Sequence, residues 1–430
     1  MQCEQMVLSG DPTGLAQDLR ELVAAPEAVQ EQVEEIIARV RASGDDALRF
    51  YTREYDTGGT TPSSLRVPDA ELDTALARLD APVRAGLEQA IANVTRVAQA
   101  GLQDDRTVAF DGHEVILREV PVDRAAVYVP GGRAPYPSTV VMGVITARVA
   151  GVTDIAVSSP PGADGEVNSV VLGACRLAGA SAVYRMGGAQ AIAALAFGTE
   201  TVAPVDVIVG PGNLYVQEAK RHLSAEVGID GFAGPSDLVT VLGEQAGERG
   251  VELAVLDLLA QAEHGAGSLV VAIAPNGQTL DELEQTLERL LVARPTVGEA
   301  TCALVEVTDA RGAVELANEL APEHLELIGA DVEALAPIVR SAGALFVGEG
   351  GATAFGDYVA GSNHVLPTGG AGRFASGLSA RHFRRRMQEV RIGVEAVGKL
   401  AAAGAPIARA EGFEVHAESM EARMRENPDL

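Results

Sequence analysis

The chain contains 430 residues, 47% of them hydrophobic and 22% charged, and its length predicts about two or three domains. Its 60 acidic and 33 basic residues give a formal net charge of −27. This argues against nucleic acid and anionic membranes as partners, because both require a basic surface. Only Lys220 and Lys399 are lysines, which we attribute to genome composition bias, with a mild salt adaptation as the alternative.

Cysteine is sparse, and Cys3, Cys175 and Cys302 are scattered along the chain. An odd number of distant cysteines predicts a reducing compartment and no disulfide framework. The N-terminus lacks the basic and apolar regions of a signal peptide, and no run approaches the roughly 18 apolar residues of a membrane span. We therefore expect a soluble cytoplasmic protein.

The first quarter of the chain is predicted to be largely helical. Apolar residues recur at helical spacing over residues 27–56 and 69–101, and "TGGTTPSS" between them is typical of a loop. Residues 107–120 contain two strand-like runs on either side of Asp111-Gly112, a pair that predicts a β-hairpin.

From residue 125 onward, strand and helix patterns alternate as far as residue 228, and after a loop at 229–237 the alternation restarts and reaches residue 349. This predicts an α/β fold with two doubly wound, incomplete Rossmann-like lobes built on parallel sheets. We expect ligands beyond the carboxyl ends of the strands. A helix is expected at 331–342, a glycine-rich loop at 350–377 and a helical tail at 380–430.

The common cofactor motifs are absent. No G-x-G-x-x-G occurs, and "GPGN" (210–213) has only the first two glycines of that fingerprint. The segment "GVEAVGKL" (393–400) resembles a phosphate-binding loop, but Leu400 stands where Ser or Thr should hold magnesium and no strand precedes it. Three glycine-rich turns, at 128–139, 185–190 and 209–213, lie between strands and helices. They indicate a cofactor site in that lobe, although tight connections also need glycine.

Four histidines lie in unusual polar clusters at the ends of predicted elements. The clusters pair the residues Gln261 with His264, Glu323 with His324, Asp357 with His364, and Glu411 with His416. Nitrogen and carboxylate donors of this kind suit zinc with an open coordination position. Each cluster also has an ordinary interpretation as a helix cap, a polar turn or a solvated tail, so the residues alone leave metal, substrate and solvent as alternatives.

Several long segments together resemble the histidinol dehydrogenase family. They are "VYVPGGRAPYPSTVVM", "GGAQAIAALAFGT", "VGPGN", "AGPSD", "QAEHG", "APEHLEL" and "GDYVAGSNHVLPTGG", which occur in the family's order. The resemblance covers essentially the whole chain from about residue 30. It implies oxidation of L-histidinol through L-histidinal to L-histidine, the last step of histidine biosynthesis, with two NAD molecules used in sequence.

The resemblance also implies residue roles. One Zn²⁺ per subunit is expected on the residues Gln261, His264, Asp357 and His416, which also serve the substrate. Glu323 and His324 match the catalytic pair, with His324 as general acid and base and Glu323 activating water for the second oxidation. Further substrate contacts are expected from Ser236, His364 and Glu411, and NAD contacts from Tyr128, Gln190 and Asn213.

The expected organisation follows from these roles. Residues 1–24 form an N-terminal arm, residues 25–127 with 238–378 a discontinuous substrate and zinc lobe, 128–237 the NAD-binding lobe, and 379–430 a C-terminal dimerisation tail. The family resemblance implies an intertwined homodimer, and we expect the tail to bring Glu411 and His416 to the partner's site. A zinc hydrolase and a non-catalytic NAD- or metal-binding module are the competing hypotheses.

Overall fold

A computed structural model describes residues 3–23, 28–131, 134–232, 234–265, 267–297 and 299–424. Gly132 and Arg133 of the first glycine-rich turn, Ala233 of "AGPSD" and Ala266 after "QAEHG" lie outside the described residues. The chain divides into two units, which we describe separately. Unit 1 comprises Met1–Gly101 and Val122–Phe383, and unit 2 comprises Leu102–Pro121 and Arg384–Leu430.

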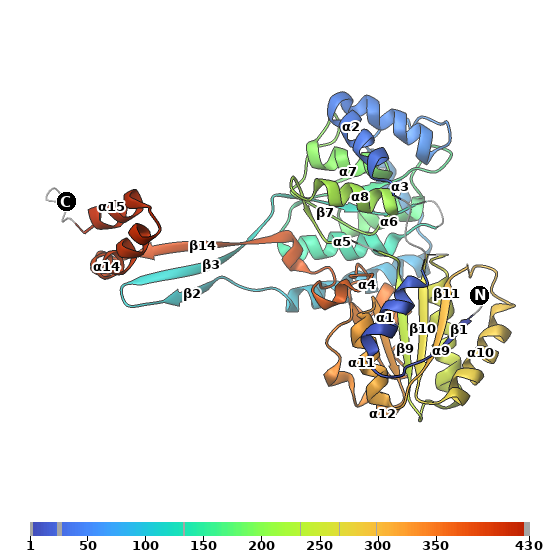
Figure 1. The fold of residues 1–430 in the computed structure, drawn as a ribbon. Helices are drawn as coiled ribbons and strands as arrows, with labels where there is room; N and C mark the ends of the chain where they lie inside the picture. The colour runs from blue at the N-terminus through green and yellow to red at the C-terminus, as the bar shows by residue number, and fades with distance from the viewer. Residues whose placement is uncertain are drawn as a thin grey trace. The chain divides into compact units, whose positions relative to one another are not determined.

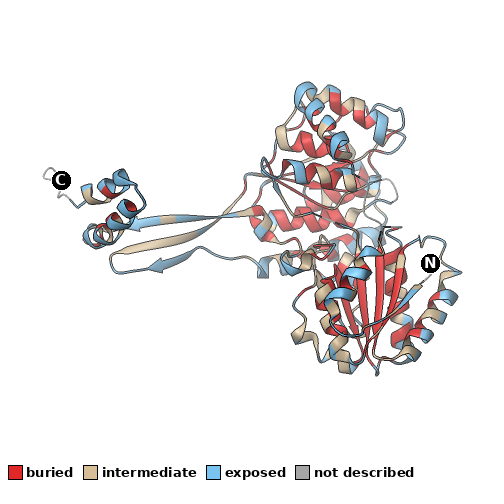
Figure 2. Ribbon diagram, in the orientation of Figure 1, coloured by how far each residue is buried: buried red, intermediate tan, exposed pale blue. Residues whose placement is uncertain are grey.

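One lobe of unit 1 is built on a six-stranded parallel sheet (Figure 1). Its strands, in spatial order, are β1 (Cys3–Val7), β11 (Thr301–Glu306), β10 (Leu269–Ala274), β9 (Asp237–Leu242), β12 (His324–Ile328) and β13 (Ala344–Val347). Every residue of β9, β10 and β12 is buried, as expected for strands covered on both faces (Figure 2). Helices α1 (Pro12–Glu21) and α11 (Ala310–Leu320) cover one face, and α9 (Gly247–Ala262) and α10 (Gly277–Leu291) the other.

The other lobe of unit 1 contains a five-stranded parallel sheet. Its spatial order is β6 (Ala182–Arg185), β5 (Asp154–Ser159), β4 (Arg124–Tyr128), β7 (Val207–Val209) and β8 (Gly228–Ile229). Numbered along the chain, these strands run 3-2-1-4-5, the order of a Rossmann half with its switch point between β4 and β7. The connecting helices are α5 (Pro137–Ala150), α6 (Ser169–Ala178), α7 (Gly188–Phe197) and α8 (Leu214–Leu223).

The N-terminal helices pack onto the lobe with the five-stranded sheet. Helix α2 (Gln30–Tyr51) contacts α7 and α8, and continues into a π-helical turn, η1 (Thr52–Asp56). Helix α3 (Asp69–Ala77) contacts α6, and α4 (Ala81–Ala100) contacts α5. The division predicted from the sequence places residues 25–127 with 238–378 instead, because amphipathic spacing identifies a helix but not the surface that it covers.

Unit 2 consists of a three-stranded antiparallel sheet and two helices. The strands are β14 (Arg384–Ile392), β3 (His113–Pro121) and β2 (Arg106–Ala109), in that spatial order, and the helices are α14 (Val394–Ala410) and α15 (Glu414–Ala422). The hairpin predicted at Asp111-Gly112 is confirmed, and Gly112 takes the positive φ of +80° that the turn requires. Most side chains of β14 and β2 are exposed (Figure 2).

The expected α/β fold with two doubly wound parallel sheets is confirmed, but three local predictions are wrong. The tail is not helical from residue 380, because a short 3-10 turn, η4 (Ala380–Phe383), and strand β14 precede its helices. The helix expected at 331–342 shrinks to α12 (Ala330–Glu333) and a 3-10 turn, η2 (Ala336–Ile338), that contains Pro337. The loop at 350–377 contains α13 (Thr353–Tyr358) and the 3-10 turn η3 (Ala371–Arg373).

The expectation that no disulfide forms is also wrong. Cys3 and Cys302 form a disulfide, with their Cα atoms 4.5 Å apart. The cause is strand β1, which the sequence analysis left in the N-terminal arm. It pairs with β11 in a register that places Cys3 opposite Cys302. Cys175 is a free, buried thiol.

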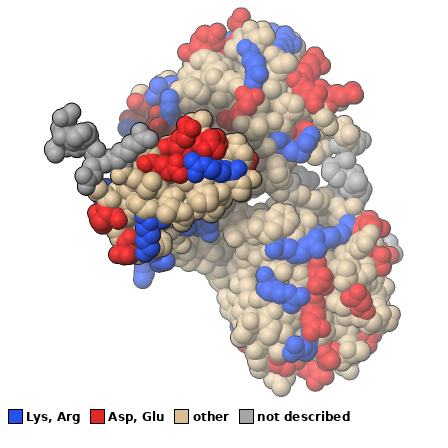
Figure 3. Space-filling view, turned by 60° about the vertical axis from the view of Figure 1, so that its left-hand side comes forward, with Lys and Arg blue, Asp and Glu red and all other residues tan. Residues whose placement is uncertain are grey.

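The surface and the helices bear on possible partners. On the face drawn in Figure 3, acidic and basic side chains are interspersed among uncharged ones. In the described ranges, no helix combines the length and the apolar content needed to cross a membrane.

Candidate active site

The C-terminal end of α9 presents two of the predicted metal ligands. Gln261 lies in the last turn of the helix and is buried, whereas His264 follows the C-cap residue Glu263 and is exposed. Residues three apart lie on one side of a helix. The Nδ1 atom of His264 lies 3.1 Å from the carbonyl oxygen of Gln261.

A sharp turn delivers the predicted catalytic pair. Helix α11 ends at Leu320 and is capped by Ala321, which has a φ of +46° and is the one non-glycine residue with positive φ in the described part of the chain. Pro322 follows, and then Glu323 and His324 at the start of β12. A left-handed residue before proline is costly, so the packing around this buried turn must hold it in place.

Glu323 is the centre of a buried hydrogen-bond network. The Ser236 hydroxyl donates to Oε2 of Glu323 and accepts a hydrogen bond of 2.5 Å from Nε2 of Gln261. The backbone N–H of Asp237 donates to the same Glu323 oxygen at 3.2 Å, and the N–H of Glu323 donates back to Oδ1 of Asp237. Arg20 of α1 lies 3.8 Å from the other oxygen of Asp237. The network joins β9, β12 and α9 at one point.

His324 lies between two carboxyl groups. Its Nε2 is 3.4 Å from Oδ1 of Asp357, and its Nδ1 is 3.9 Å from Oε2 of Glu323. Both ring nitrogens are buried, and neither has a partner that meets hydrogen-bond geometry in the described structure. A buried imidazole with unused hydrogen-bonding capacity is suited to exchanging protons with a bound molecule.

His364 connects the two lobes of unit 1. Its Nδ1 lies 2.8 Å from the carbonyl oxygen of Asp357, and its Nε2 lies 3.1 Å from the hydroxyl of Thr139 in α5. Both ring nitrogens therefore have partners within the chain, so a substrate contact by His364 would have to replace the bond to Thr139.

The protonation of these groups follows from burial and neighbouring charge. Burial raises the pKa of Glu323 to about 7 and that of Asp237 to about 6. Burial opposes the charged form of His324, but Asp357, Glu323 and Asp237 outweigh it and raise the pKa of His324 to about 9. Asp357 shows the opposite balance, because its interaction with His324 outweighs burial and lowers its pKa. Burial lowers the pKa of His364.

The donor set in unit 1 fits zinc. Gln261, His264 and Asp357 supply an amide oxygen, an imidazole nitrogen and a carboxylate. A proton on Nδ1 of His264, directed at the carbonyl of Gln261, would leave Nε2 as the ligand atom, the usual arrangement at metal-binding histidines. Nε2 of Gln261 donates to Ser236, so the amide oxygen is the atom of this side chain that would be left to face a metal.

Unit 2 carries the remaining predicted ligand. Glu411 is the C-cap of α14, and His416 lies in α15, stacked obliquely on Phe413 with ring centroids 5.2 Å apart. Both are exposed. Among the described residues, no group of three His, Cys, Asp or Glu side chains is placed to hold a metal ion.

The three predicted NAD contacts line a single cavity of about 1740 Å³ in unit 1. Tyr128 ends β4, Gln190 lies in the first turn of α7, and Asn213 caps α8 by accepting a hydrogen bond from the N–H of Val216 at 3.2 Å. Tyr128 and Asn213 follow the two strands at the switch point of the five-stranded sheet, where Rossmann-like sheets bind ligands.

Asp56 is a cavity residue that the sequence analysis missed. Its Oδ2 accepts hydrogen bonds from the N–H of Gly187 at 3.1 Å and from Nε2 of Gln190 at 3.4 Å. Burial raises the pKa of Asp56 to about 7. The next N–H, of Gly188, donates to the Tyr128 hydroxyl at 3.1 Å, and burial raises the pKa of that hydroxyl. No sequence signal marks Asp56, because it acts on a turn more than 130 residues away.

A second missed group lies beneath the catalytic pair. Glu326 of β12 is buried, accepts a hydrogen bond of 3.0 Å from Thr240 of β9, and is hydrogen-bonded to Asp257 of α9. Burial and the neighbouring carboxyl raise the pKa of Glu326 well above its usual range, and burial raises that of Asp257. A hydrogen bond between two carboxyl groups requires a proton on one of them, and this pair links α9 to β12.

The predicted site residues lie at the carboxyl edge of one sheet and at the amino edge of the other, although all of them were expected beyond the carboxyl ends of strands. In the five-stranded sheet, the predicted contacts follow the carboxyl ends of the strands. In the six-stranded sheet, Ser236 precedes β9, His324 starts β12, and Gln261 ends a helix that returns to the amino edge. The predicted substrate and zinc residues therefore lie at the amino ends of these strands.

Comparisons with known proteins identify the family of the chain. The family model for histidinol dehydrogenase matches residues 20–424. Histidinol dehydrogenase of Pseudomonas fluorescens is 40% identical over 412 residues, which cover 93% of this chain and 92% of the relative. That of Rhodospirillum rubrum is 42% identical over 419 residues, covering 95% and 93%. The crystal structure of histidinol dehydrogenase from Elizabethkingia anophelis superposes with a TM-score of 0.91 at 28% identity, covering 98% of both chains. The family match over most of the length, together with the agreement in fold, establishes that this chain belongs to the histidinol dehydrogenase family of oxidoreductases.

Proposed function

We propose that this enzyme oxidises L-histidinol through L-histidinal to L-histidine with one zinc ion per subunit and two NAD molecules used in sequence. The observation that carries the proposal is the contact of His324 with both Glu323 and Asp357, beside the ligand-bearing end of α9. An alcohol-to-acid conversion removes four electrons, so two hydrides must leave, and NAD accepts one in each oxidation.

In the first oxidation, His324 takes the proton of the substrate hydroxyl. In the second, the carboxylate of Glu323 removes a proton from the water that adds to the aldehyde, and His324 accepts the next proton. Ser236, bonded to both Glu323 and Gln261, keeps the carboxylate aimed at the same point. His324 must be neutral to act as a base. Ligation of Asp357 to a cation would reduce its pull on the imidazolium, and the pKa of His324 would then fall toward neutrality.

Zinc would be held by Gln261, His264, Asp357 and His416. When bound, it would orient the substrate through the imidazole and amino nitrogens of histidinol. Glu411, His364 and Ser236 are the further substrate contacts. We assign NAD to the lobe of residues 128–237, with contacts from Tyr128, Gln190 and Asn213, and substrate and zinc to residues 238–378.

We further propose a homodimer in which residues 379–430 are exchanged, so that Glu411 and His416 complete the site of the partner subunit. Support comes from unit 2 taken by itself. Both its sheet and its helices expose large apolar side chains that nothing within the unit covers. Among them are Met387, Val390, Ile392, Val394, Ile407, Phe413 and Val415. Apolar patches of this kind mark protein interfaces. Since the family's reaction belongs to histidine biosynthesis, we place the enzyme in the cytoplasm.

The direct test mixes the protein with histidinol and NAD and follows the absorbance of reduced nicotinamide. The proposal expects absorbance that depends on both compounds. A zinc hydrolase or a non-catalytic NAD- or metal-binding module would produce none, and this result would overturn the proposal.

A further inference from the structure

One of the two lysines of the chain is fully buried. Lys399 lies on the surface of α14, whereas the side chain of Lys220 in α8 is only 1% exposed. The other 31 of the 33 basic residues are arginines. Lysine is therefore rare in this chain, and one of its two lysines lies at a site that solvent does not reach. The contacts of its ammonium group show what it does there.

The ammonium group of Lys220 contacts Gly210 directly and is also connected to it through Asp230. Nζ donates to the carbonyl oxygen of Gly210 at 2.8 Å and to Oδ1 of Asp230 at 2.5 Å. The other oxygen of Asp230, Oδ2, accepts from the N–H of Gly210 at 2.7 Å. The buried ion pair thus satisfies both backbone polar groups of Gly210. We call these three residues the Gly210 clamp.

Gly210 lies where the predicted NAD contacts meet. It follows β7 with a φ of +116°, and a Cβ atom there would be 2.1 Å from the carbonyl oxygen of Tyr128. Only glycine can bring the backbone of β7 this close to β4. Three residues later, Asn213 caps α8. The position of Gly210 therefore fixes the spacing of Tyr128 and Asn213 across the switch point of the sheet.

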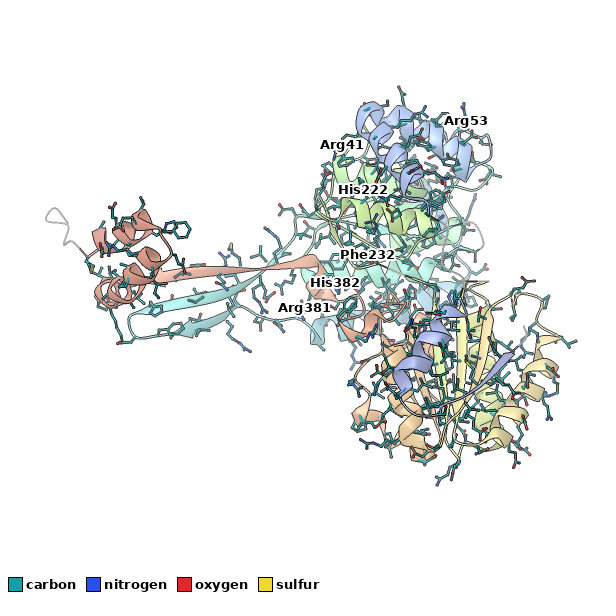
Figure 4. The ribbon with its side chains drawn as sticks, in the orientation of Figure 1. Arg41, Arg53, His222, Phe232, Arg381 and His382 are labelled. Carbon is teal, nitrogen blue, oxygen red and sulfur yellow. A yellow bond between two sulfur atoms is a disulfide. The ribbon has the colours of Figure 1, made fainter. Side chains whose placement is uncertain are left out.

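Asp230 extends the clamp toward the other lobe. It follows β8 and begins the loop that leads to Ser236 before β9. In Figure 4, His222 marks α8 and Phe232 marks this loop. Helix α8, the turn after β7 and the start of the Ser236 loop are thereby joined by a single ion pair.

We propose that Lys220 and Asp230 are positioning residues for the cofactor, which hold the Gly210–Asn213 turn in the conformation that binds NAD. The inference rests on the proposed NAD site. Neither residue lines the cavity, so both act through Gly210 rather than by contact. A point charge on a flexible stem can approach a carbonyl and a carboxylate together in this space, whereas the larger planar guanidinium cannot.

The test compares three variants with the wild-type holoenzyme. Lys220→Met removes the ammonium group, and Lys220→Arg keeps the charge. Arg148→Met is the control, because Arg148 also bonds a backbone carbonyl, that of Ala178 at 2.7 Å, but at the far end of α5. NAD affinity is measured by calorimetry, the KM for NAD and kcat by assay, and folding by thermal unfolding. We expect Lys220→Met and Lys220→Arg each to raise the Kd and KM for NAD by about tenfold or more with kcat within about threefold, and Arg148→Met to change neither.

The outcomes separate this inference from the proposed function. Wild-type protein that binds no NAD would refute the proposed function itself. Wild-type protein that binds NAD, alongside folded Lys220 variants that bind it equally well, would refute the clamp alone. A fall in kcat with unchanged NAD affinity would also refute it. If Lys220→Met does not fold, the double variant Lys220→Met with Asp230→Asn decides. It leaves no buried charge unpaired, and the asparagine oxygen can still accept from the N–H of Gly210. It should therefore fold and show the weakened NAD affinity, and unchanged affinity would overturn the inference.

Discussion

In the proposed mechanism the imidazole of His324 moves protons and does not bind zinc. Its ring nitrogens face Asp357 and Glu323, and its side chain is buried at the start of β12. We predict that His324→Asn lowers turnover by a factor of about 10² to 10⁴, because asparagine cannot exchange protons, while zinc stays bound. Metal analysis of the purified variant together with the assay checks this. Loss of zinc along with activity would show that His324 is a ligand.

Asp56 should leave a signature in the pH dependence of stability. Its pKa is about 7 in the folded protein, against a reference value of 3.8. For an acid with a raised pKa, the folded state keeps a proton that the unfolded state has lost. Stability therefore falls as pH rises from about 4 to about 7, by at most about 4 kcal/mol. Asp56→Asn removes this titration. The free energy of unfolding is measured in urea for both proteins. The value for the variant minus that for the wild type should increase as pH rises across this interval. A difference that stays constant with pH would contradict the raised pKa.

Single residues at element ends were predictable from the sequence, and their partners were not. Gln261, His264, Glu323 and His324 attract attention because polar groups interrupt apolar runs exactly where elements end or begin. Asp56, Thr139 and Asp230 carry no such signal, since each is an ordinary polar residue whose partner is distant in the chain. Their roles depend on tertiary contacts that spacing alone does not specify.

Helix α9 and strand β12 each carry part of the proposed site, and the Asp257–Glu326 pair joins them. We predict that Glu326→Gln is tolerated, because its amide can donate to Asp257 and accept from Thr240. Glu326→Leu leaves both partners buried without a bond and should lower the free energy of unfolding by about 2 kcal/mol or more. It should also weaken zinc retention at the end of α9. Urea unfolding and zinc competition with a chelator measure the two effects. If the two variants have the same free energy of unfolding and retain zinc equally well, the Asp257–Glu326 pair does not hold α9 against β12.

Predictability also differed among the strands. The central strands β9 and β10 are mostly apolar, because both of their faces are buried, and they were predicted. Strand β14, "RRRMQEVRI", was taken for helix. It is exposed on most of its length, so no apolar alternation marks it, and its pairing with β3 spans more than 260 residues. Strand β1 was missed for the same reason, as an exposed edge strand whose partner lies some 300 residues away.

At the scale of the whole molecule, the tail-exchange proposal makes a strict prediction. Refolding equal amounts of two inactive variants, His264→Ala and His416→Ala, produces mixed dimers. If the tail completes the partner's site, one site of each mixed dimer carries both lesions and the other carries none. About half of the dimers are mixed, so roughly a quarter of wild-type activity should return. If each tail serves its own subunit, every site keeps one lesion and the mixture stays as inactive as its parents.

The central claim is a four-electron, zinc-dependent oxidation of histidinol at the site formed around Glu323, His324 and the end of α9. It is tested most directly by counting the reduced nicotinamide formed from a limiting amount of histidinol, with enzyme that has been stripped by a chelator and then reloaded with zinc. The account predicts no product before zinc is returned, and two molecules of reduced nicotinamide with one of histidine for each histidinol afterwards. One reduced nicotinamide per histidinol, or full activity in the stripped enzyme, would contradict it.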